Sequence, residues 1–350
     1  MRAMKRPRRR ERPSCFVVVI GLALALSTGC GPRSDLPHEL SNQEFWRLFV
    51  AVSEPQPDHA MSEHYVSNEP RVAESARQLR SSGGVYIGVG PEQNFTYMAR
   101  MRPRMAFIID IRRENADLHL LYKALFELCD DRIAFVSRLF SRHAPEELSR
   151  NADAGAIFDR YEQAAPSVAL LAQTKGLVRA HLLRTRALPL EPRDLEAIDR
   201  ALQTFAAAGP AIDYWGSETV EKDAIRPSYR RLMTMPDLTG QTRSFLADAA
   251  SFRVIKDLHQ RNLIVPAVGD FGGAEAIRRV GAYVRDHHDN VRAFYASNVS
   301  VYLTNRQARA FCANLTALPV SRDAAFVDSK SVVPFAARLA ACRDEETRRQ

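Results

Sequence analysis

Residues 83–113 place a glycine turn between two apolar runs, and this stretch restricts the fold more than any other part of the chain. The run at 85–89 is rich in β-branched and aromatic residues and is bounded by glycines, which predicts a buried strand. Gly88 and Gly90 allow the backbone to take a positive φ or to approach a ligand closely. The sequence therefore predicts a strand that ends in a tight glycine turn.

A short helix and a second strand are expected after the turn. Pro91 is tolerated at the first position of a helix, and Glu92 and Asn94 favour a helix amino terminus. The second apolar run, at 105–109, ends at Asp110. A strand, a helix and a second strand in this order form the unit from which parallel α/β sheets are built.

The glycine turn and Asp110 are expected to lie on one edge of the sheet, because ligands of open α/β sheets bind beyond the carboxyl ends of the strands. Asp110 follows Gly90 by about twenty residues, as in dinucleotide-binding sequences, although Gln93 stands where their third glycine would be. This layout predicts a site for a nucleotide or S-adenosylmethionine, with a carboxylate for the ribose hydroxyls. The alternative is that the glycines and the acid serve only to end a strand and form a turn.

The same arrangement recurs later in the chain. Residues 262–273 read as a strand that ends in Gly-Asp and a glycine turn, and Pro266 within it indicates an edge position or a bulge. Further strands are expected at 290–299 and 324–328. The following polar strand ends are expected to share one edge of the sheet: Asp110, Asp270 and Asn298.

The segment between the second and third strands is long, and its pattern is helical. Apolar positions at helical spacing continue through 131–210, and 211–250 is rich in loops of the kind that act as lids. On the helix before this segment, His119 and Lys123 lie one turn apart and could reach a ligand, although a solvated flank is the commoner role of such a pair. Residues 65–69 could also return to the ligand edge.

Strands that alternate with helices predict the α/β class, and more finely a Rossmann-like, doubly wound, mainly parallel sheet with a helical insertion between the second and third strands. The domain assignment follows from this pattern. It comprises a signal peptide at 1–29, a linker at 30–40, a single domain at 41–330 that includes the insertion at 131–210, and a helical or frayed tail at 331–350.

A basic amino terminus precedes a short apolar core. Residues 1–13 hold seven Lys or Arg side chains and one acid, a net +6 of the chain's +8, and small or apolar residues fill 16–26. This core is too short to span a bilayer comfortably, and the pattern is typical of a secretory signal peptide. The alternatives are an uncleaved anchor and a nucleic-acid-binding arm. Because the basic excess belongs to the signal, we expect no nucleic-acid partner.

Residues 26–30, Leu-Ser-Thr-Gly-Cys, resemble the processing box of bacterial lipoproteins, although Ser27 stands where a leucine is usual. The resemblance implies that Cys30 becomes the lipid-bearing first residue of an exported protein anchored at the periplasmic face of a membrane. Cys129 and Cys312 lie in apolar patterns and are expected to be buried and free. The spacing of these two residues and Cys342 predicts no metal site.

Five stretches of the chain resemble a family of uncharacterised bacterial proteins related to a hypothetical Leptospira protein. The resemblance covers most of residues 40–320 and implies no activity. The matching stretches are 84–97, 105–113, 121–128, 262–271 and 293–299.

At the level of the fold, the chain is similar to class I S-adenosylmethionine-dependent methyltransferases. Gly88 and Gly90 match their glycine motif, and Asp110 matches their acid after the second strand. Asp270 resembles the strand end that holds the adenine, and Asn298 resembles the polar residue that faces the methyl acceptor. The similarity implies S-adenosylmethionine as the cofactor. The short glycine motif, the long helical segment and the lack of an Asn-Pro-Pro-Tyr-like motif depart from that family.

Two functions from different classes remain open. A methyltransferase-like enzyme would conflict with an exported address, because S-adenosylmethionine is a cytoplasmic metabolite. An exported lipoprotein without catalytic activity would keep the fold and bind another small ligand or partner. No Gly-x-Ser-x-Gly or His-Glu-x-x-His motif supports a hydrolase, and the sequence motivates no catalytic residue. The candidate binding residues are Gly88, Gly90, Glu92, Asn94, Asp110, Arg112, Asp270 and Asn298.

Overall fold

The computed structural model describes residues 34–55, 64–80, 83–216 and 227–347, and these described residues belong to one compact unit. The predicted signal peptide at 1–29 and the predicted lipidation site Cys30 lie outside the described residues. The unit combines a six-stranded sheet with helices, so the predicted α/β class is confirmed.

The sheet has the strand order β3-β2-β1-β4-β5-β6. Strands β1 to β5 run parallel, and β6 pairs antiparallel with β5. Each of the five predicted strands is present, and the mostly parallel sheet is compatible with a Rossmann-like fold. Their bounds are β1 Val85–Gly88, β2 Met105–Asp110, β3 Ile264–Val268, β4 Val291–Ser297, β5 Val320–Asp328 and β6 Val332–Pro334.

Burial explains why the central strands read as continuous apolar runs. Every residue of β1, β2 and β3 is buried, as expected for a parallel sheet with both faces covered. Strand β3 lies at one edge of the sheet, where Pro266 is opposite Ile108 of β2. The edge position predicted from Pro266 is therefore confirmed.

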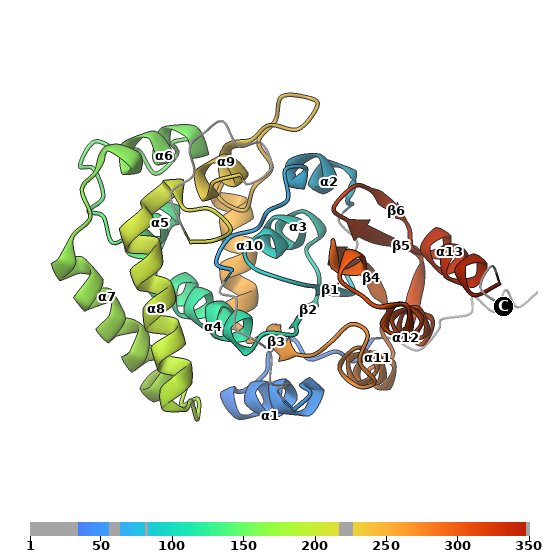
Figure 1. Cartoon of the computed structure of the whole chain (residues 1–350). Helices are drawn as coiled ribbons and strands as arrows, with labels where there is room; N and C mark the ends of the chain where they lie inside the picture. Colours follow the sequence, from blue (N-terminus) through green and yellow to red (C-terminus); the bar gives the residue numbers. More distant parts are fainter. Residues whose placement is uncertain (1–33, 56–63, 81–82, 217–226, 348–350) are drawn as a thin grey trace, which may run out of the picture. The chain divides into compact units, whose positions relative to one another are not determined.

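Helices cover both faces of the sheet (Figure 1). On one side α1 packs against β3 and α11, α11 packs against β2 and α12, and α12 packs against α13. On the other side α3 packs against α2 and α10, and α4 packs against α10 and β3. The bounds are α1 Asn42–Val52, α2 Val72–Gln78, α3 Gln93–Met101, α4 Arg113–Leu128, α10 Ala249–Gln260, α11 Ala276–Asp286, α12 Asn305–Thr316 and α13 Phe335–Thr347, with a 3₁₀ turn η3 at Val299–Val301.

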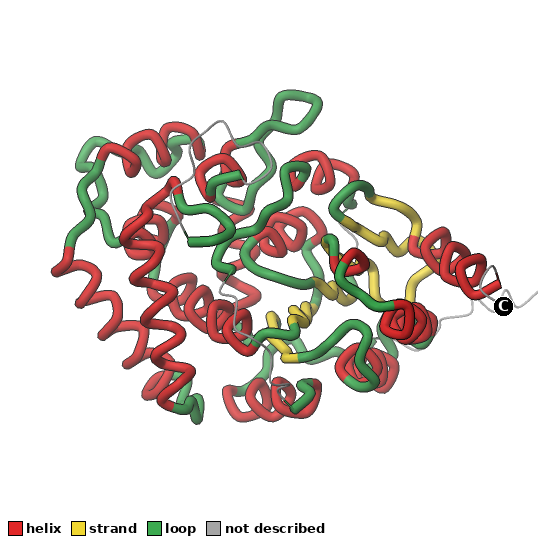
Figure 2. The backbone as a smooth tube through the Cα atoms, viewed as in Figure 1, coloured by secondary structure: helices red, strands yellow, loops and turns green. Residues whose placement is uncertain are grey.

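A further group of helices lies beyond α4, away from the strands (Figure 2). These helices belong to the long segment between β2 and β3, and α5 and α8 pack directly on α4. Their bounds are α5 Arg132–Phe140, α6 Ala154–Gln163, α7 Val168–Ala180, the π-helical turn η1 His181–Thr185, α8 Pro192–Ala208, the 3₁₀ turn η2 Gly209–Ala211 and α9 Tyr229–Thr234.

Lys123 of α4 is buried in the core. Its ammonium group donates to the Glu127 carboxylate at 2.7 Å, to the His259 carbonyl at 2.6 Å and to the Asn262 amide oxygen at 2.5 Å. Lys123 therefore joins α4 to the turn between α10 and β3. The sequence offered it as a ligand contact or as part of a solvated flank, and the structure shows neither.

The carboxyl-terminal segment contains a disulfide between Cys312 of α12 and Cys342 of α13. The prediction that Cys312 is free is wrong, because α13 folds back onto α12 and brings the two sulfur atoms together. Cys129 is free and buried, as predicted. Residues 331–350 were expected to be helical or frayed, and they contain β6 as well as α13.

Opening this disulfide should destabilise the protein measurably. The bond closes a loop over a sequence separation of 30 residues, for which the loss on reduction is about 3–4 kcal/mol of unfolding free energy. Urea unfolding with and without dithiothreitol measures this loss. A Cys312→Ala/Cys342→Ala variant is the control, since its unfolding should not respond to the reductant. Equal stability of the wild type in both conditions would contradict the prediction.

Candidate functional site

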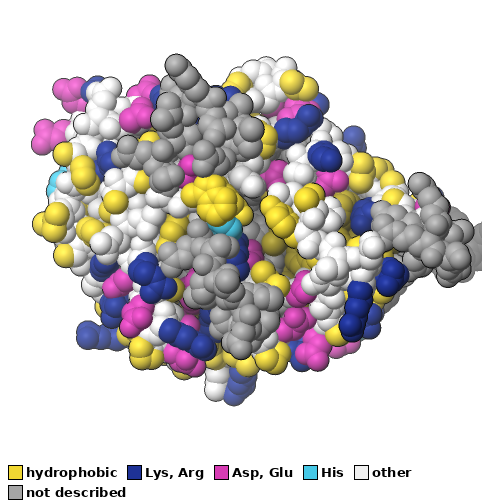
Figure 3. Space-filling model, viewed as in Figure 1, with side chains coloured by type: hydrophobic (Ala, Val, Ile, Leu, Met, Phe, Trp, Pro, Cys, Tyr) yellow, Lys and Arg dark blue, Asp and Glu magenta, His cyan; other side chains and the backbone are white. Residues whose placement is uncertain are grey.

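A cavity of about 610 Å³ lies beyond the carboxyl ends of β1, β2, β3 and β4. Figure 3 shows hydrophobic side chains around a hollow on the face seen in Figure 1. Ligands of open α/β sheets bind at this edge, outside the point where the strand order reverses. The loops after the four strands each supply lining residues, and five of the predicted site residues are among them: Gly90, Asp110, Arg112, Asp270 and Asn298.

The glycine turn after β1 is held by a buried asparagine. The Asn94 amide donates to the three carbonyls of residues 89–91 at 2.7–3.1 Å, and its oxygen accepts from the Tyr86 hydroxyl at 2.8 Å. A side chain at Gly88 would place its Cβ 2.0 Å from this oxygen. Gly88 and Asn94 therefore shape the turn from behind, while Gly90, with a φ of 77°, lines the cavity.

Glu92 is fully buried and does not line the cavity. Its carboxyl oxygens lie 3.3 Å from the backbone N–H of Ser67. Burial raises the pKa of Glu92 to about 8 and outweighs the backbone hydrogen bonds, which act in the opposite direction. Glu92 is therefore mainly protonated at neutral pH and joins the turn to the segment at 64–69.

Asp110 and Arg112 form a charged pair on the cavity wall. The Arg112 Nε lies 2.9 Å from one Asp110 oxygen and its Nη2 lies 2.9 Å from the other, while the Arg112 backbone N–H donates at 3.0 Å. Burial alone would raise the pKa of Asp110, but the charge and hydrogen bonds of Arg112 hold it below its ordinary value. Asp110 is thus ionised and lines the cavity, and a carboxylate oxygen can accept more than one hydrogen bond.

Aromatic rings from two distant segments form another wall of the cavity. The His64 ring stacks on Tyr214 with centroids 3.8 Å apart, and Trp215 meets His64 edge-on at 4.9 Å. Burial lowers the pKa of His64 to about 4, so the ring is neutral at pH 7. Trp215 and Tyr302 keep 56% and 71% of their surface exposed while they line the cavity. Such a wall suits a planar ring.

The strand end of β4 contributes a second polar group. Ser297 lines the cavity beside Asn298, and its hydroxyl donates to the buried carboxylate of Glu69. The Tyr295 hydroxyl donates to the same carboxylate oxygen at 3.2 Å. Burial raises the pKa of Glu69, although both hydroxyls act in the opposite direction.

The turn after β3 is closed by an internal carboxylate. Glu54 accepts from the backbone N–H groups of Asp270 at 3.1 Å, Glu275 at 3.1 Å and Ala276 at 2.8 Å. Asp270 itself accepts from the Gln307 amide at 3.2 Å. Although this glycine turn resembles the one after β1, Glu54 occupies the place that an anionic ligand would take. Of the turn, Gly269, Asp270 and Phe271 line the cavity.

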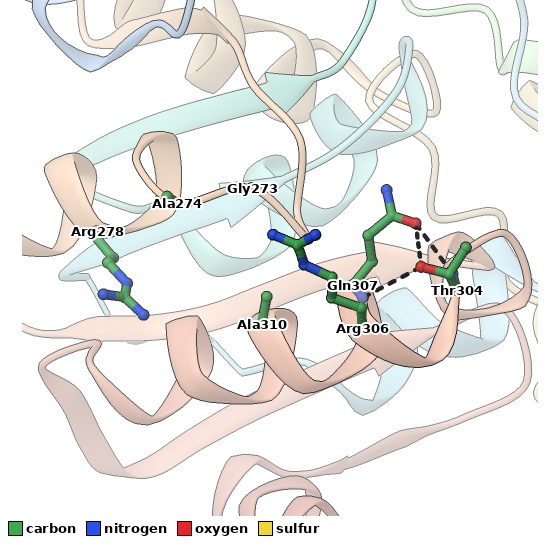
Figure 4. A pocket seen from close by; sticks show the side chains of 8 residues that line it. Gly273, Ala274, Arg278, Thr304, Arg306, Gln307 and Ala310 are labelled. Carbon is green, nitrogen blue, oxygen red and sulfur yellow. Dashed lines mark hydrogen bonds between the residues drawn. The ribbon is translucent and has the colours of Figure 1, made fainter.

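A second hollow of about 570 Å³ is lined by Gly272 and Gly273 of this turn and by Gln307, which also lines the larger cavity (Figure 4). The side chains of Arg278 from α11 and Arg306 from α12 line it. Gln307 also accepts from Thr304 in a capping box at the start of α12. Gln307 therefore borders both hollows.

His119 supports the glycine turn from α4. Its Nε2 lies 2.9 Å from the Gly90 carbonyl, so Nε2 carries the proton and donates. Burial lowers the pKa of His119 to about 4, which keeps the ring neutral. The sequence indicated that His119 either reaches a ligand at this edge or lies on a solvated flank. In the structure its side chain is buried and contacts the glycine turn.

Comparison with known proteins gives one family. A family model described as "Domain of unknown function (DUF7790)" matches residues 64–340, which include every lining residue of the larger cavity. No curated protein matches the chain. Within the described residues, no helix is long and apolar enough to cross a membrane. In the same part of the chain, no group of three or more His, Cys, Asp or Glu side chains could hold a metal ion.

Proposed function

The chain belongs to the DUF7790 family, and we propose that it is an exported, lipid-anchored protein that binds a nucleoside-type small ligand. The site is the cavity at the carboxyl edge of a Rossmann-like, methyltransferase-like fold. In this proposal, residues 131–210 are a helical insertion in that fold. The ligand is a small molecule with a planar ring and a hydroxyl-bearing part.

One observation carries this proposal: four strand ends and an aromatic wall meet at a single cavity. The stacked His64 and Tyr214 rings offer a face for a planar ring, and Asp110 offers an ionised acceptor for hydroxyl groups. Gly90 leaves space for close approach at the turn, since nothing lies within 4 Å of the position of an added Cβ. A cavity of about 610 Å³ is of ordinary size for a small-molecule site.

Methyl transfer is the second candidate. It is favoured by the position of the cavity at the reversal of strand order between β1 and β4, where such folds hold their cofactor. Gly90 and Asp110 would contact S-adenosylmethionine, and Asn298 would face the methyl acceptor. This candidate requires that S-adenosylmethionine, a cytoplasmic metabolite, reaches the site, which disagrees with the proposed export of the protein.

The disulfide supports the proposal that the protein is exported from the cytoplasm. Disulfides persist in oxidising compartments such as the periplasm and are rare in the cytosol. The bond between Cys312 and Cys342 therefore agrees with the signal peptide and lipoprotein box expected at the amino terminus. The proposed partner of the amino terminus is a membrane, reached through lipid on Cys30.

Replacing Cys30 should abolish lipid attachment. When the full chain is expressed in a bacterium fed radiolabelled palmitate, the wild type should incorporate label and Cys30→Ser should incorporate none. Cys129→Ser is the matched control, since Cys129 is buried and is expected to leave incorporation unchanged. Equal labelling of the wild type and Cys30→Ser would refute the lipoprotein assignment.

Ligand binding is tested by thermal shift of the full chain. S-adenosylmethionine, S-adenosylhomocysteine and adenosine are titrated separately. A ligand at 100 times its dissociation constant should add about 2.7 kcal/mol of stability. A saturating shift with adenosine as well as the two larger compounds supports a nucleoside site. A shift with S-adenosylmethionine and S-adenosylhomocysteine alone favours the methyltransferase candidate. No shift with any of them at millimolar concentration would overturn both.

A further inference from the structure

Ser297 has an unusual backbone at the carboxyl end of β4. Its φ is 49°, in the left-handed region that is costly for residues other than glycine. The register between β4 and β5 shifts between Tyr295 and Ser297, so the strand ends in an irregularity of the bulge type. Bulges of this kind re-aim side chains and occur often next to active sites. Here the Ser297 side chain lines the cavity.

A buried carboxylate lies directly behind Ser297. Glu69 is 4% exposed and accepts from the hydroxyls of Ser297 and Tyr295. Among the described residues, Glu69 forms no ion pair with a basic side chain. A buried carboxylate that no cation neutralises has an increased affinity for protons, as its raised pKa shows. Glu69 is therefore a stronger base than an exposed glutamate.

We propose that Ser297 is a nucleophile, Glu69 its general base and Tyr295 the residue that positions Glu69, and that the cavity hydrolyses carboxylic esters. A nucleophile within hydrogen-bond reach of a base, which is in turn oriented by a third group, is the arrangement that activates serine. This inference goes beyond ligand binding and uses the same cavity. The substrate is an ester whose acyl carbonyl reaches Ser297 while a planar part of the molecule lies against the aromatic wall.

The reaction balances with the groups present and water. The Ser297 oxygen forms a bond to the carbonyl carbon while its proton passes to Glu69. The bond from carbon to the alcohol oxygen then breaks, and Glu69 returns the proton to the leaving alkoxide. Water attacks the acyl-serine, gives a proton to Glu69 and releases the carboxylic acid, after which Ser297 recovers its proton. The Ser297 hydroxyl also lies 3.3 Å from the Asn298 amide oxygen, so Asn298 lies beside the position of attack.

The test uses covalent labelling and ester hydrolysis by the full chain. A fluorophosphonate probe reacts with activated serines by forming an oxygen–phosphorus bond and releasing fluoride, and p-nitrophenyl acetate reports acyl transfer. We expect one probe per chain, located at Ser297 by peptide mass mapping. Ser297→Ala and Glu69→Gln should each lower the hydrolysis rate at least 100-fold. Tyr295→Phe, which removes only the orienting hydroxyl, should lower it less and leave labelling at Ser297 detectable.

Ser321→Ala is the matched control. Ser321 on β5 also donates to a carboxylate, that of Asp323, but on the surface and outside the cavity, so labelling and hydrolysis should be unchanged. Failure of the wild type to label, or labelling at another residue, overturns the proposal even if a variant fails to fold. A wild type that gives the ligand-dependent thermal shift yet neither labels nor hydrolyses ester would overturn the hydrolase inference and leave the binding function standing.

Discussion

Asp110→Ala should weaken the binding of a nucleoside-type ligand about 100-fold and lower the unfolding free energy by about 3 kcal/mol. The affinity should fall because the variant lacks the ionised acceptor for hydroxyl groups. A hydrogen bond to a charged group contributes about 1.5–3 kcal/mol. Stability suffers because the variant leaves the mostly buried Arg112 guanidinium without its carboxylate. Isothermal titration gives the first effect, and urea unfolding gives the second.

Asp289→Ala separates the two effects. Asp289 is also a largely buried carboxylate paired with an arginine, Arg104, at 3.2 Å. It lies just before β4, at the amino ends of the strands and so at the edge opposite the cavity. This variant should lose stability and keep full affinity for the ligand. Comparable losses of affinity in the two variants would show that Asp110 acts only through the fold.

The edge of the sheet that borders the cavity was predictable, because its residues follow strands that the sequence pattern identifies. The apolar runs at 85–89 and 105–109 are buried on both faces, which is why they lack alternation, and a parallel sheet necessarily places the ends of such runs together. Gly90 and Asp110 could therefore be assigned to the cavity from their positions alone. Gly88 and Asn94 could not be assigned correctly from position, because Asn94 binds the carbonyl groups of the turn and leaves no space for a side chain at Gly88.

The remaining cavity residues come from contacts between distant segments, which a single sequence does not encode locally. Glu69 meets Ser297 across 228 positions, and His64 stacks on Tyr214 although both lie in irregular segments. Arg112 is the exception, because an arginine two residues after an acid at a strand end is a local signal for a charged pair. Among the structural features, the disulfide depended in the same way on α13 folding back onto α12.

The pKa of Glu92 predicts how stability depends on pH. A carboxyl group with a pKa of about 8 when folded and 4.5 when unfolded holds a proton in the folded state that the unfolded chain has released. The free energy of unfolding therefore falls as the pH rises from about 4.5 to about 8. Each pKa unit corresponds to about 1.4 kcal/mol. Ionisation of Glu92 alone should therefore lower the free energy of unfolding by on the order of 5 kcal/mol between pH 4.5 and 8.

Glu92→Gln should remove this loss of unfolding free energy at higher pH. The glutamine has the shape of the protonated carboxyl group, and its oxygen can still accept from the Ser67 N–H, but it has no charge to bury. The variant should unfold with nearly wild-type free energy at pH 4.5, and its advantage over the wild type should grow by several kcal/mol up to pH 8. Urea unfolding at half-unit pH intervals measures this difference. Glu146→Gln, at an exposed position, is the matched control and should follow the wild-type curve. A Glu92→Gln curve parallel to that of the wild type would mean that Glu92 is already ionised in the folded protein.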